Sequence, residues 1–244
     1  MQMRSGFRGY TLAILLSAIG VTLLTSAGIA GPNRGAILLV HTDDAQDYSL
    51  GVDYSHLSGL ECPDDIECPP YDESSCYNNA CAINPTSHRG TDLTVFWVLA
   101  AVPPLEDDPD QVCPRIKGLT FGINYNEADL RIVDWGTTAR VELQTDHWPG
   151  PNEGTAIVFP DTKLSPVAEV YWFAAYAYYE TVLTLQGHPT QGGQLVDDRV
   201  PGNRDLIEGY GSIGFDGAEG TAVDCRFVLP VVDTSWGALK HGFR

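Results

Sequence analysis

The longest apolar and aromatic stretch after the N-terminus is AEVYWFAAYAYYE at residues 168–180, and it restricts the fold most strongly. A strand covered on both faces is apolar at nearly every position, whereas a half-exposed strand alternates apolar and polar residues. Aromatic and β-branched side chains suit the surface of a sheet. The alternative is a buried helix, because Ala and Glu are good helix formers. We interpret the stretch as the central strand of a sheet with both faces covered.

Short strands separated by turn-forming residues are expected on both sides of this stretch. The predicted ranges are 36–41, 48–54, 92–102, 116–126, 130–135, 139–145, 154–159, 181–186, 206–215 and 225–231, with a loop at 187–205. No stretch of the mature chain has a convincing 3.6-residue apolar period, and helices do not alternate with strands. The sequence therefore predicts a single all-β domain, an antiparallel β-sandwich over residues 31–232, and argues against Rossmann and TIM-barrel enzymes.

The N-terminus has the features of a secretory signal peptide covering residues 1–30. Arg4 and Arg8 precede an apolar run at 11–24, which is shorter than the roughly 20 residues that span a bilayer. Small residues occupy the −3 and −1 positions of a cleavage site before Gly31; they are Gly28 and Ala30. No later run is long and apolar enough to span a membrane. We expect a secreted, periplasmic or cell-surface protein.

The charge balance is strongly acidic, with 14 Lys and Arg against 32 Asp and Glu and a net charge of -18. Such a surface repels phosphate backbones, so a nucleic acid partner is not expected. Carboxylates suit calcium, which takes several oxygen ligands. The candidate ligands are Asp107, Asp108 and Asp110 in an acidic loop, with further acidic groups at 43–47 and 197–198. Calcium is the one cofactor considered, and the alternative is a solvated acidic surface.

Six cysteines are expected to form disulfides, as an oxidising compartment allows. They are Cys62, Cys68, Cys76, Cys81, Cys113 and Cys225. The first four lie in residues 55–90, a stretch rich in Pro, Asp, Asn and Ser that we interpret as a disulfide-stapled loop insert. We expect these four to pair locally and the last two to pair with each other. The C-x5-C-x7-C-x4-C spacing lacks the C-x2-C pair typical of zinc sites.

Part of the predicted sandwich resembles a known family. The pattern F-x-I-x-Y-(D/N)-x-x-x-L is carried by Phe121, Ile123, Tyr125, Asn126 and Leu130. It is similar to the front half of cohesin-type β-sandwiches, and the resemblance implies a sandwich of the cohesin-like, Ig-like or jelly-roll-like kind.

The whole chain also resembles a set of uncharacterised secreted bacterial proteins. The matching segments are KGLTFGI at 117–123, YWFAAYAY at 171–178, HPTQGG at 188–193 and WGALK at 236–240. This resemblance implies a protein of the bacterial exterior and brings no activity with it.

Two loops contain the candidate ligand-binding residues. In the first, His188 and Gln191 lie close in sequence to Asp197, and two adjacent glycines permit backbone conformations that other residues avoid. The alternative is an ordered turn whose polar groups satisfy its own backbone. In the second, Trp148 stands next to prolines, where an exposed ring stacks on a sugar or a partner surface. The alternative is a ring folded back over the end of the sandwich.

The sequence contains few signals of an enzyme. A serine nucleophile elbow needs glycine two residues before the serine, and Tyr210 stands there relative to Ser212. Glu169 and Glu180 flank the central strand, but at ~3.3 Å per residue they lie about 36 Å apart, too far for a glycosidase pair. No catalytic residue is assigned, although acids from different strands can still converge in the fold.

We interpret the chain as a secreted, non-enzymatic binding or structural module of the bacterial cell exterior, whose ligand is a polysaccharide or a protein. One alternative is a carboxylate-dependent hydrolase such as a glycosidase, which a cleft with two close acids would favour. Another is a self-assembling surface-layer or filament subunit that docks through its C-terminal tail, residues 233–244. That tail is basic on an acidic protein, and Trp236 and Lys240 are its candidate docking residues, unless the terminus is simply frayed.

Overall fold

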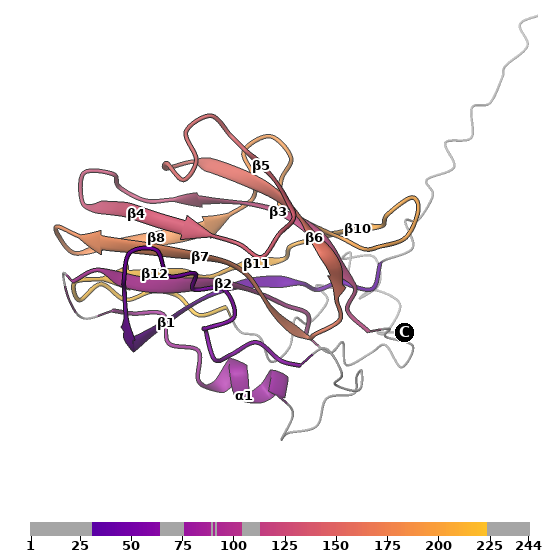
Figure 1. Cartoon of the computed structure of the whole chain (residues 1–244), viewed down its shortest axis with the longest axis horizontal. Helices are drawn as coiled ribbons and strands as arrows, with labels where there is room; N and C mark the ends of the chain where they lie inside the picture. The colour runs from indigo at the N-terminus through magenta and orange to yellow at the C-terminus, as the bar shows by residue number, and fades with distance from the viewer. Residues whose placement is uncertain (1–30, 64–75, 89, 91, 104–112, 224–244) are drawn as a thin grey trace, which may run out of the picture.

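The computed structural model describes residues 31–63, 76–88, 90, 92–103 and 113–223 (Figure 1). Several predictions from the sequence therefore concern residues outside the described ones. These are the signal peptide at 1–30, the acidic calcium loop with Asp107, Asp108 and Asp110, the strand at 225–231, and the tail with Trp236 and Lys240.

Two sheets make up the described fold. In sheet A the strand order is β11 (Gly209–Tyr210), β1 (Ile37–Asp47), β2 (Thr94–Ala101), β7 (Val167–Ala177) and β4 (Leu130–Gly136). In sheet B the order is β10 (Arg204–Leu206), β9 (Gln194–Val196), β3 (Ile116–Asn124), β6 (Glu153–Lys163) and β5 (Val141–Gln144). β8 (Thr181–Gln186) also pairs with β3, and β12 (Ser212–Phe215) pairs with β8. All these pairs are antiparallel except β1 with β11. The predicted all-β sandwich is confirmed.

Strand β7 is buried along almost its whole length, as the aromatic stretch predicted. Tyr171 and Phe173 point into the core between the two sheets, while Trp172 and Ala174 belong to a second cluster on the opposite face of sheet A. The pairing of β2 with β7 shifts register between Val98 and Leu99. This bulge places Val170 in the core beside Tyr171, whereas strict alternation along the strand would place Val170 on the same face as Trp172.

The outer face of sheet A is covered by the described residues between β1 and β2 (48–63, 76–88, 90 and 92–93), which we call the cover. The cover contributes Tyr54, Leu60 and Tyr77, each at most 5% exposed, to two clusters that include side chains of β1, β2 and β7. Figure 1 shows its helix α1 (Cys76–Ala82) on one side of the strands of sheet A, with β3, β5 and β6 on the other. Sheet A is thus a middle layer, and this explains why β7 is apolar on both faces.

The predicted strand at 48–54 is wrong, because this part of the cover runs through turns. Its tyrosines pack instead of pairing: the ring centroids of Tyr48 and Tyr54 lie 5.8 Å apart, and Tyr54 makes an edge contact with Trp172 at 5.2 Å. The indole N–H of Trp97 donates to the backbone oxygen of Tyr54 at 2.8 Å. In residues 48–54, these ring and side-chain contacts take the place of strand pairing.

A disulfide between Cys62 and Cys76 fastens the cover, so local pairing in the cysteine-rich insert is confirmed for this pair. The bond joins a buried residue of the cover to the first residue of α1. Cys81 and Cys113 are disulfide-bonded as well, and none of the described cysteines is free. Cys68 and Cys225 lie outside the described residues, so the predicted pairing of Cys113 with Cys225 stays a prediction.

The predicted loop at 187–205 contains regular structure, which corrects the expectation. β8 and β9 both pair antiparallel with β3, at Gly122–Asn124 and Gly118–Thr120 respectively. They are two parts of one strand line along β3, interrupted by an excursion at 187–193. Similarly, the strand predicted at 206–215 is divided among β10, β11 and β12, and Gly209 and Gly211 within this stretch pack closely on β1.

His41 in β1 makes stability depend on pH. Its ring is 6% exposed and stacks on Trp97 with a centroid distance of 5.9 Å, and burial lowers its pKa from the ordinary value. Below about pH 6.5 the unfolded chain therefore binds a proton that the folded chain resists. The free energy of unfolding consequently decreases as the pH is lowered. The loss reaches at most about 1.4 kcal/mol per pH unit.

We expect His41→Phe to reduce the loss of stability between pH 7.5 and 5, measured by urea unfolding. His147→Gln is the control, because its ring is exposed. An equal loss in wild type and His41→Phe would contradict the assignment.

Candidate functional site

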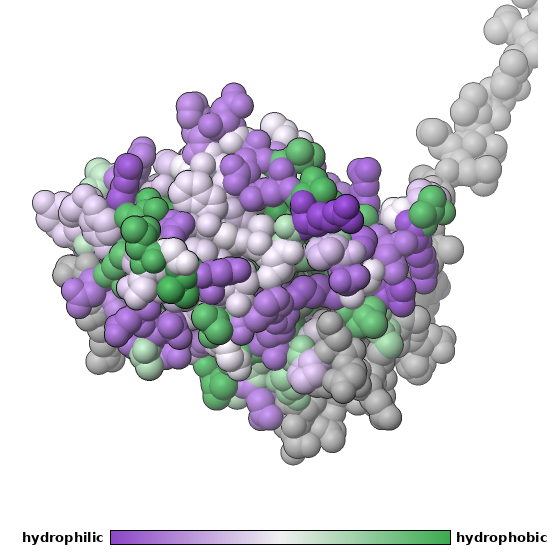
Figure 2. Space-filling model, viewed as in Figure 1, coloured by the Kyte–Doolittle hydropathy of each residue, from purple (hydrophilic) through white to green (hydrophobic). Residues whose placement is uncertain are grey.

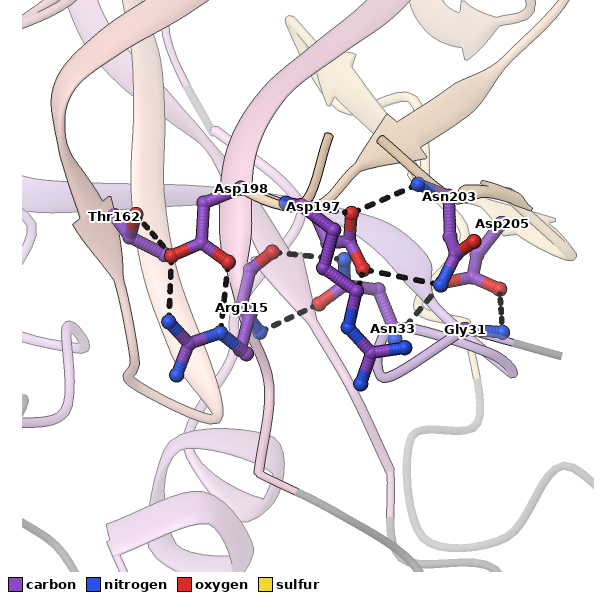
Figure 3. A network of polar contacts seen from close by, with 9 residues as sticks. Gly31, Asn33, Arg115, Thr162, Asp197, Asp198, Asn203 and Asp205 are labelled. Atoms are coloured by element: carbon purple, nitrogen blue, oxygen red, sulfur yellow. Dashed lines mark hydrogen bonds and ion pairs between the residues drawn. The ribbon is translucent and has the colours of Figure 1, made fainter. Parts of the chain in front are cut away.

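Asp197 and Asp198, predicted to line a ligand or cation site, turn toward different partners within the fold (Figure 3). The Asp197 carboxylate is 2% exposed and accepts hydrogen bonds from the backbone N–H groups of Arg199 (3.1 Å) and Asn203 (2.8 Å). It thereby closes the turn between β9 and β10. This placement favours a structural role for Asp197.

Asp198 forms a two-pronged ion pair with Arg115, from Nε at 2.8 Å and Nη2 at 2.5 Å. Thr162 on β6 donates a further hydrogen bond at 3.1 Å. These hydrogen bonds, those from Arg115 above all, lower the pKa of Asp198 to about 2. The pair links the chain before β3 to the chain after β9. Asp198, like Asp197, is therefore engaged in contacts within the fold.

The His188 side chain forms hydrogen bonds with the backbone of its own loop, the excursion at 187–193. Its Nδ1 accepts hydrogen bonds from the N–H groups of Thr190 (3.2 Å) and Gln191 (3.3 Å), and burial lowers its pKa. The hydroxyl of Thr120 on β3 donates to the backbone oxygen of Gly192 at 2.8 Å. Gly192 has a φ of 70°, a conformation that glycine adopts readily. The HPTQGG motif is thus an ordered turn, with Gln191 exposed at its surface.

Trp148 lies in the core, so the prediction of an exposed stacking ring is wrong. The residue is 7% exposed, and its ring packs edge-on against Phe121 (5.6 Å) and Tyr171 (5.7 Å). Its indole N–H donates to the hydroxyl of Tyr171 at 2.9 Å, and that hydroxyl donates to Glu142 at 2.8 Å. The ring folds back over the end of the sandwich, where both its apolar body and its N–H have partners.

Strand β5 has an inverted pattern that sequence reasoning missed. Glu142 points inward, where it accepts hydrogen bonds from Tyr171 and Thr155, so its neighbours Val141 and Leu143 face solvent. Val141 is 46% exposed and pairs in register with Val158 on β6, which is 43% exposed; Leu143 is 66% exposed. The sequence V-E-L-Q carries this alternation, but it does not say which face is inside. We call Val141, Leu143 and Val158 the β5–β6 patch.

The end of β7 carries exposed aromatic rings. Tyr178 and Tyr179 are 53% and 66% exposed and follow β7 directly. The hydroxyls of Tyr176 and Tyr178 lie 2.8 Å apart, with the rings at 81° to each other. These are the tyrosines of the central stretch that the core does not absorb.

A polar hollow of about 430 Å³ lies where the cover meets β6. It is lined by His56, Gly59, Glu61, Cys62, Pro63 and Lys163. The Glu61 carboxylate contacts His56 Nδ1 at 2.5 Å and Lys163 Nζ at 2.7 Å. Burial raises the pKa of Glu61, but the hydrogen bonds from Lys163 and His56 outweigh it and hold the pKa below its ordinary value. The ionisable side chains that line the hollow are thus paired with one another.

Glu169, considered as a hydrolase acid, is 3% exposed under the cover. Burial raises its pKa, although the carboxylate accepts hydrogen bonds from the N–H groups of His56 (2.7 Å) and Ser58 (3.2 Å). Glu180 is exposed beyond β7. The two acids do not converge.

Among the described residues, no group of three or more His, Cys, Asp or Glu side chains is arranged to hold a metal ion. In the same part of the chain, no helix has the length and apolarity to cross a membrane.

No protein-family model matches the chain, and no curated protein matches its sequence. Solved structures similar to it are cohesin modules. The seventh ScaB type I cohesin from Pseudobacteroides cellulosolvens is 12% identical, covering 57% of this chain and 90% of its own, with a TM-score of 0.40. A non-cellulosomal cohesin from Archaeoglobus fulgidus is 13% identical, covering 54% and 86%, with a TM-score of 0.37.

A third similar structure is the cohesin module of a Clostridium perfringens family 33 glycoside hydrolase, 9% identical over 53% of this chain and 88% of that module, with a TM-score of 0.37. The resemblance to cohesin-type sandwiches is confirmed in this sense. At this level the likeness concerns about half of the chain and says nothing of its ligand or activity.

The buried position of Trp148 predicts a structural effect of substitution. We expect Trp148→Ala to lower the free energy of unfolding by about 3–5 kcal/mol, because the change opens a cavity and leaves the Tyr171 hydroxyl without its donor. Trp135→Ala is the matched control, since Trp135 is 36% exposed, and should cost less. Chemical unfolding measures both. Unchanged stability of Trp148→Ala together with lost glycan binding would restore the exposed-ring hypothesis.

Proposed function

We propose that this chain is a secreted, non-enzymatic binding module that holds an extracellular protein partner on the outer face of sheet B, at the β5–β6 patch. The observation that carries the proposal is the difference between the two sheets. The outer face of sheet A is covered by the segment between β1 and β2. The outer face of sheet B keeps aliphatic side chains in solvent.

The shape of sheet B suits a protein surface. Leu119, Phe121 and Ile123 of β3 point into the core, and the alternate positions Gly118, Thr120 and Gly122 are buried as well. Within the sheet, Val158 of the β5–β6 patch pairs in register with Gly118, which adds no side chain beside it. Aliphatic groups beside a flat sheet favour contact with another protein, whereas sugars are bound chiefly by stacked rings.

The edge of sheet B offers a second element of recognition. β5 ends the strand order of the sheet, so one side of its backbone has no neighbouring strand among the described elements. Such an edge accepts an added strand from a partner, while alternate side chains provide specificity. The outward alternation of Val141 and Leu143 around the inward Glu142 supplies these side chains.

The β5–β6 patch is small, since it consists of three aliphatic side chains. Figure 2 shows hydrophobic residues as small green groups between hydrophilic ones on the face it presents, not as one continuous apolar area. A patch of a few aliphatic side chains is typical of a modest or transient interface. We therefore expect a reversible complex instead of an obligate one.

The test uses the secreted, disulfide-containing chain as immobilised bait for proteins released from the surface of the source bacterium. Val141→Glu/Leu143→Glu should lower capture of the specific partner at least tenfold, because two charges enter an apolar contact. The matched control is Leu206→Glu on β10 at the opposite end of sheet B, where Leu206 is 69% exposed. Both changes lie on the surface and should leave unfolding within about 0.5 kcal/mol of wild type.

Capture by wild type and Leu206→Glu, with loss in the double variant, would support the proposed face. A partner held equally by all three baits would contradict it.

The exposed tyrosines favour a second candidate, a polysaccharide ligand at the turn after β7. Tyr178 and Tyr179 present rings to solvent at the end of the sandwich, and such rings stack on sugars. Binding to a glycan panel that is lost in Tyr178→Ala/Tyr179→Ala, and kept in Val141→Glu/Leu143→Glu, would favour this alternative over the protein partner.

A further inference from the structure

Asp205 on β10 is a buried carboxylate aimed at the beginning of the described chain (Figure 3). It is 5% exposed. Its Oδ1 accepts a hydrogen bond from the nitrogen of Gly31 at 2.7 Å, and its Oδ2 accepts one from the N–H of Asn33 at 2.9 Å. Both oxygens of one side chain are thus used to hold the main chain at 31–33.

The segment that Asp205 holds is fixed from a second side. The side-chain amide of Asn33 is fully buried and donates to the backbone oxygen of Arg115 at 3.0 Å. In return the N–H of Arg115 donates to Oδ1 of Asn33 at 2.8 Å. The main chain at 31–33 is therefore locked between the start of β3 and β10, and the nitrogen of Gly31 has a defined position.

No cation among the described residues pairs with Asp205. Arg115 pairs with Asp198, and Arg199 pairs with Asp197. A buried carboxylate is costly unless a positive charge and hydrogen bonds compensate it. The site supplies the hydrogen bonds and lacks the charge.

The residue at position 31 must also be small. A Cβ on Gly31 would lie 2.3 Å from Oδ2 of Asp205 and 2.8 Å from its carboxyl carbon. Glycine is thus the residue that lets the main-chain nitrogen approach the carboxylate this closely. The same glycine follows the cleavage site predicted from the small residues Gly28 and Ala30.

We propose that Asp205 is a receptor site for the α-ammonium group created when residues 1–30 are removed. Hydrolysis of the Ala30–Gly31 amide consumes one water, leaves a carboxylate on Ala30, and frees an amine on Gly31 that takes up a proton at neutral pH. The nitrogen already 2.7 Å from Asp205 then carries a positive charge, and the hydrogen bond becomes a buried ion pair. Removal of residues 1–30 thus supplies the positive charge that the buried carboxylate of Asp205 lacks.

The experiment first identifies the N-terminus of the chain secreted by a bacterial host, by intact mass and N-terminal sequencing. We expect Gly31. Two otherwise identical chains are then prepared, one beginning at Gly31 and one at Ile29, which moves the amine away from Asp205. Each is made with and without Asp205→Asn, and the unfolding equilibrium of all four is measured by urea.

We expect the chain beginning at Gly31 to have an unfolding equilibrium constant at least tenfold lower than the chain beginning at Ile29, equivalent to about 1.4 kcal/mol. Asp205→Asn should abolish that difference. Arg115, Asp197, Asp198 and Arg199 are present in all four chains, so their contributions cancel. A mature chain that begins elsewhere, or an equal effect of Asp205→Asn on both starts, would overturn the proposal.

A second measurement keeps the test decisive if Asp205→Asn does not fold. With Asp205 intact, the stability difference between the two starts should shrink as the pH rises well above 8, where α-amines lose their proton. A difference that stays constant with pH would mean that no charge is involved, and the proposal would fail.

Discussion

The double-sided burial of β7 is the constraint on which the rest of the structure depends. A strand with Phe173 on one face and Trp172 on the other needs apolar material on both sides, and a two-layer sandwich supplies only one. The segment between β1 and β2 supplies the other, through Tyr54, Leu60 and Tyr77. The described part of the segment between β1 and β2 is therefore a third layer of the fold, and the Cys62–Cys76 disulfide fastens it.

This layering covers part of the outer face of sheet A. Among the described residues, the β5–β6 patch and the tyrosines after β7 keep hydrophobic side chains in solvent. Three buried acids also have a structural role. Glu169, Asp197 and Asp205 each accept hydrogen bonds from backbone N–H groups and hold loops against the sheets. In a chain with a net charge of -18, part of the acidity thus serves the loops of the fold and not a ligand.

The sequence was most informative where one residue pattern has one structural solution. The apolar stretch at 168–180 predicted a doubly covered strand, and the cohesin-type pattern at 121–130 predicted a sandwich. It was least informative where a long-range partner decides the outcome. Trp148 is buried because Phe121 and Tyr171 enclose its ring, and Val141 and Leu143 are exposed because Glu142 finds Tyr171 inside. No local pattern around these residues reveals such contacts, and the same holds for the turn that His188 caps.

Hydrogen exchange, read by mass spectrometry, tests most directly whether the segment between β1 and β2 is a structural layer. Tyr77→Ala removes a fully buried ring from that layer, and Leu50→Ala, at a residue 89% exposed, is the control. The account predicts faster exchange in β2 and β7 of Tyr77→Ala, with β3 and β6 at wild-type rates. Unchanged exchange in β2 and β7, or an equal rise in both sheets, would contradict it.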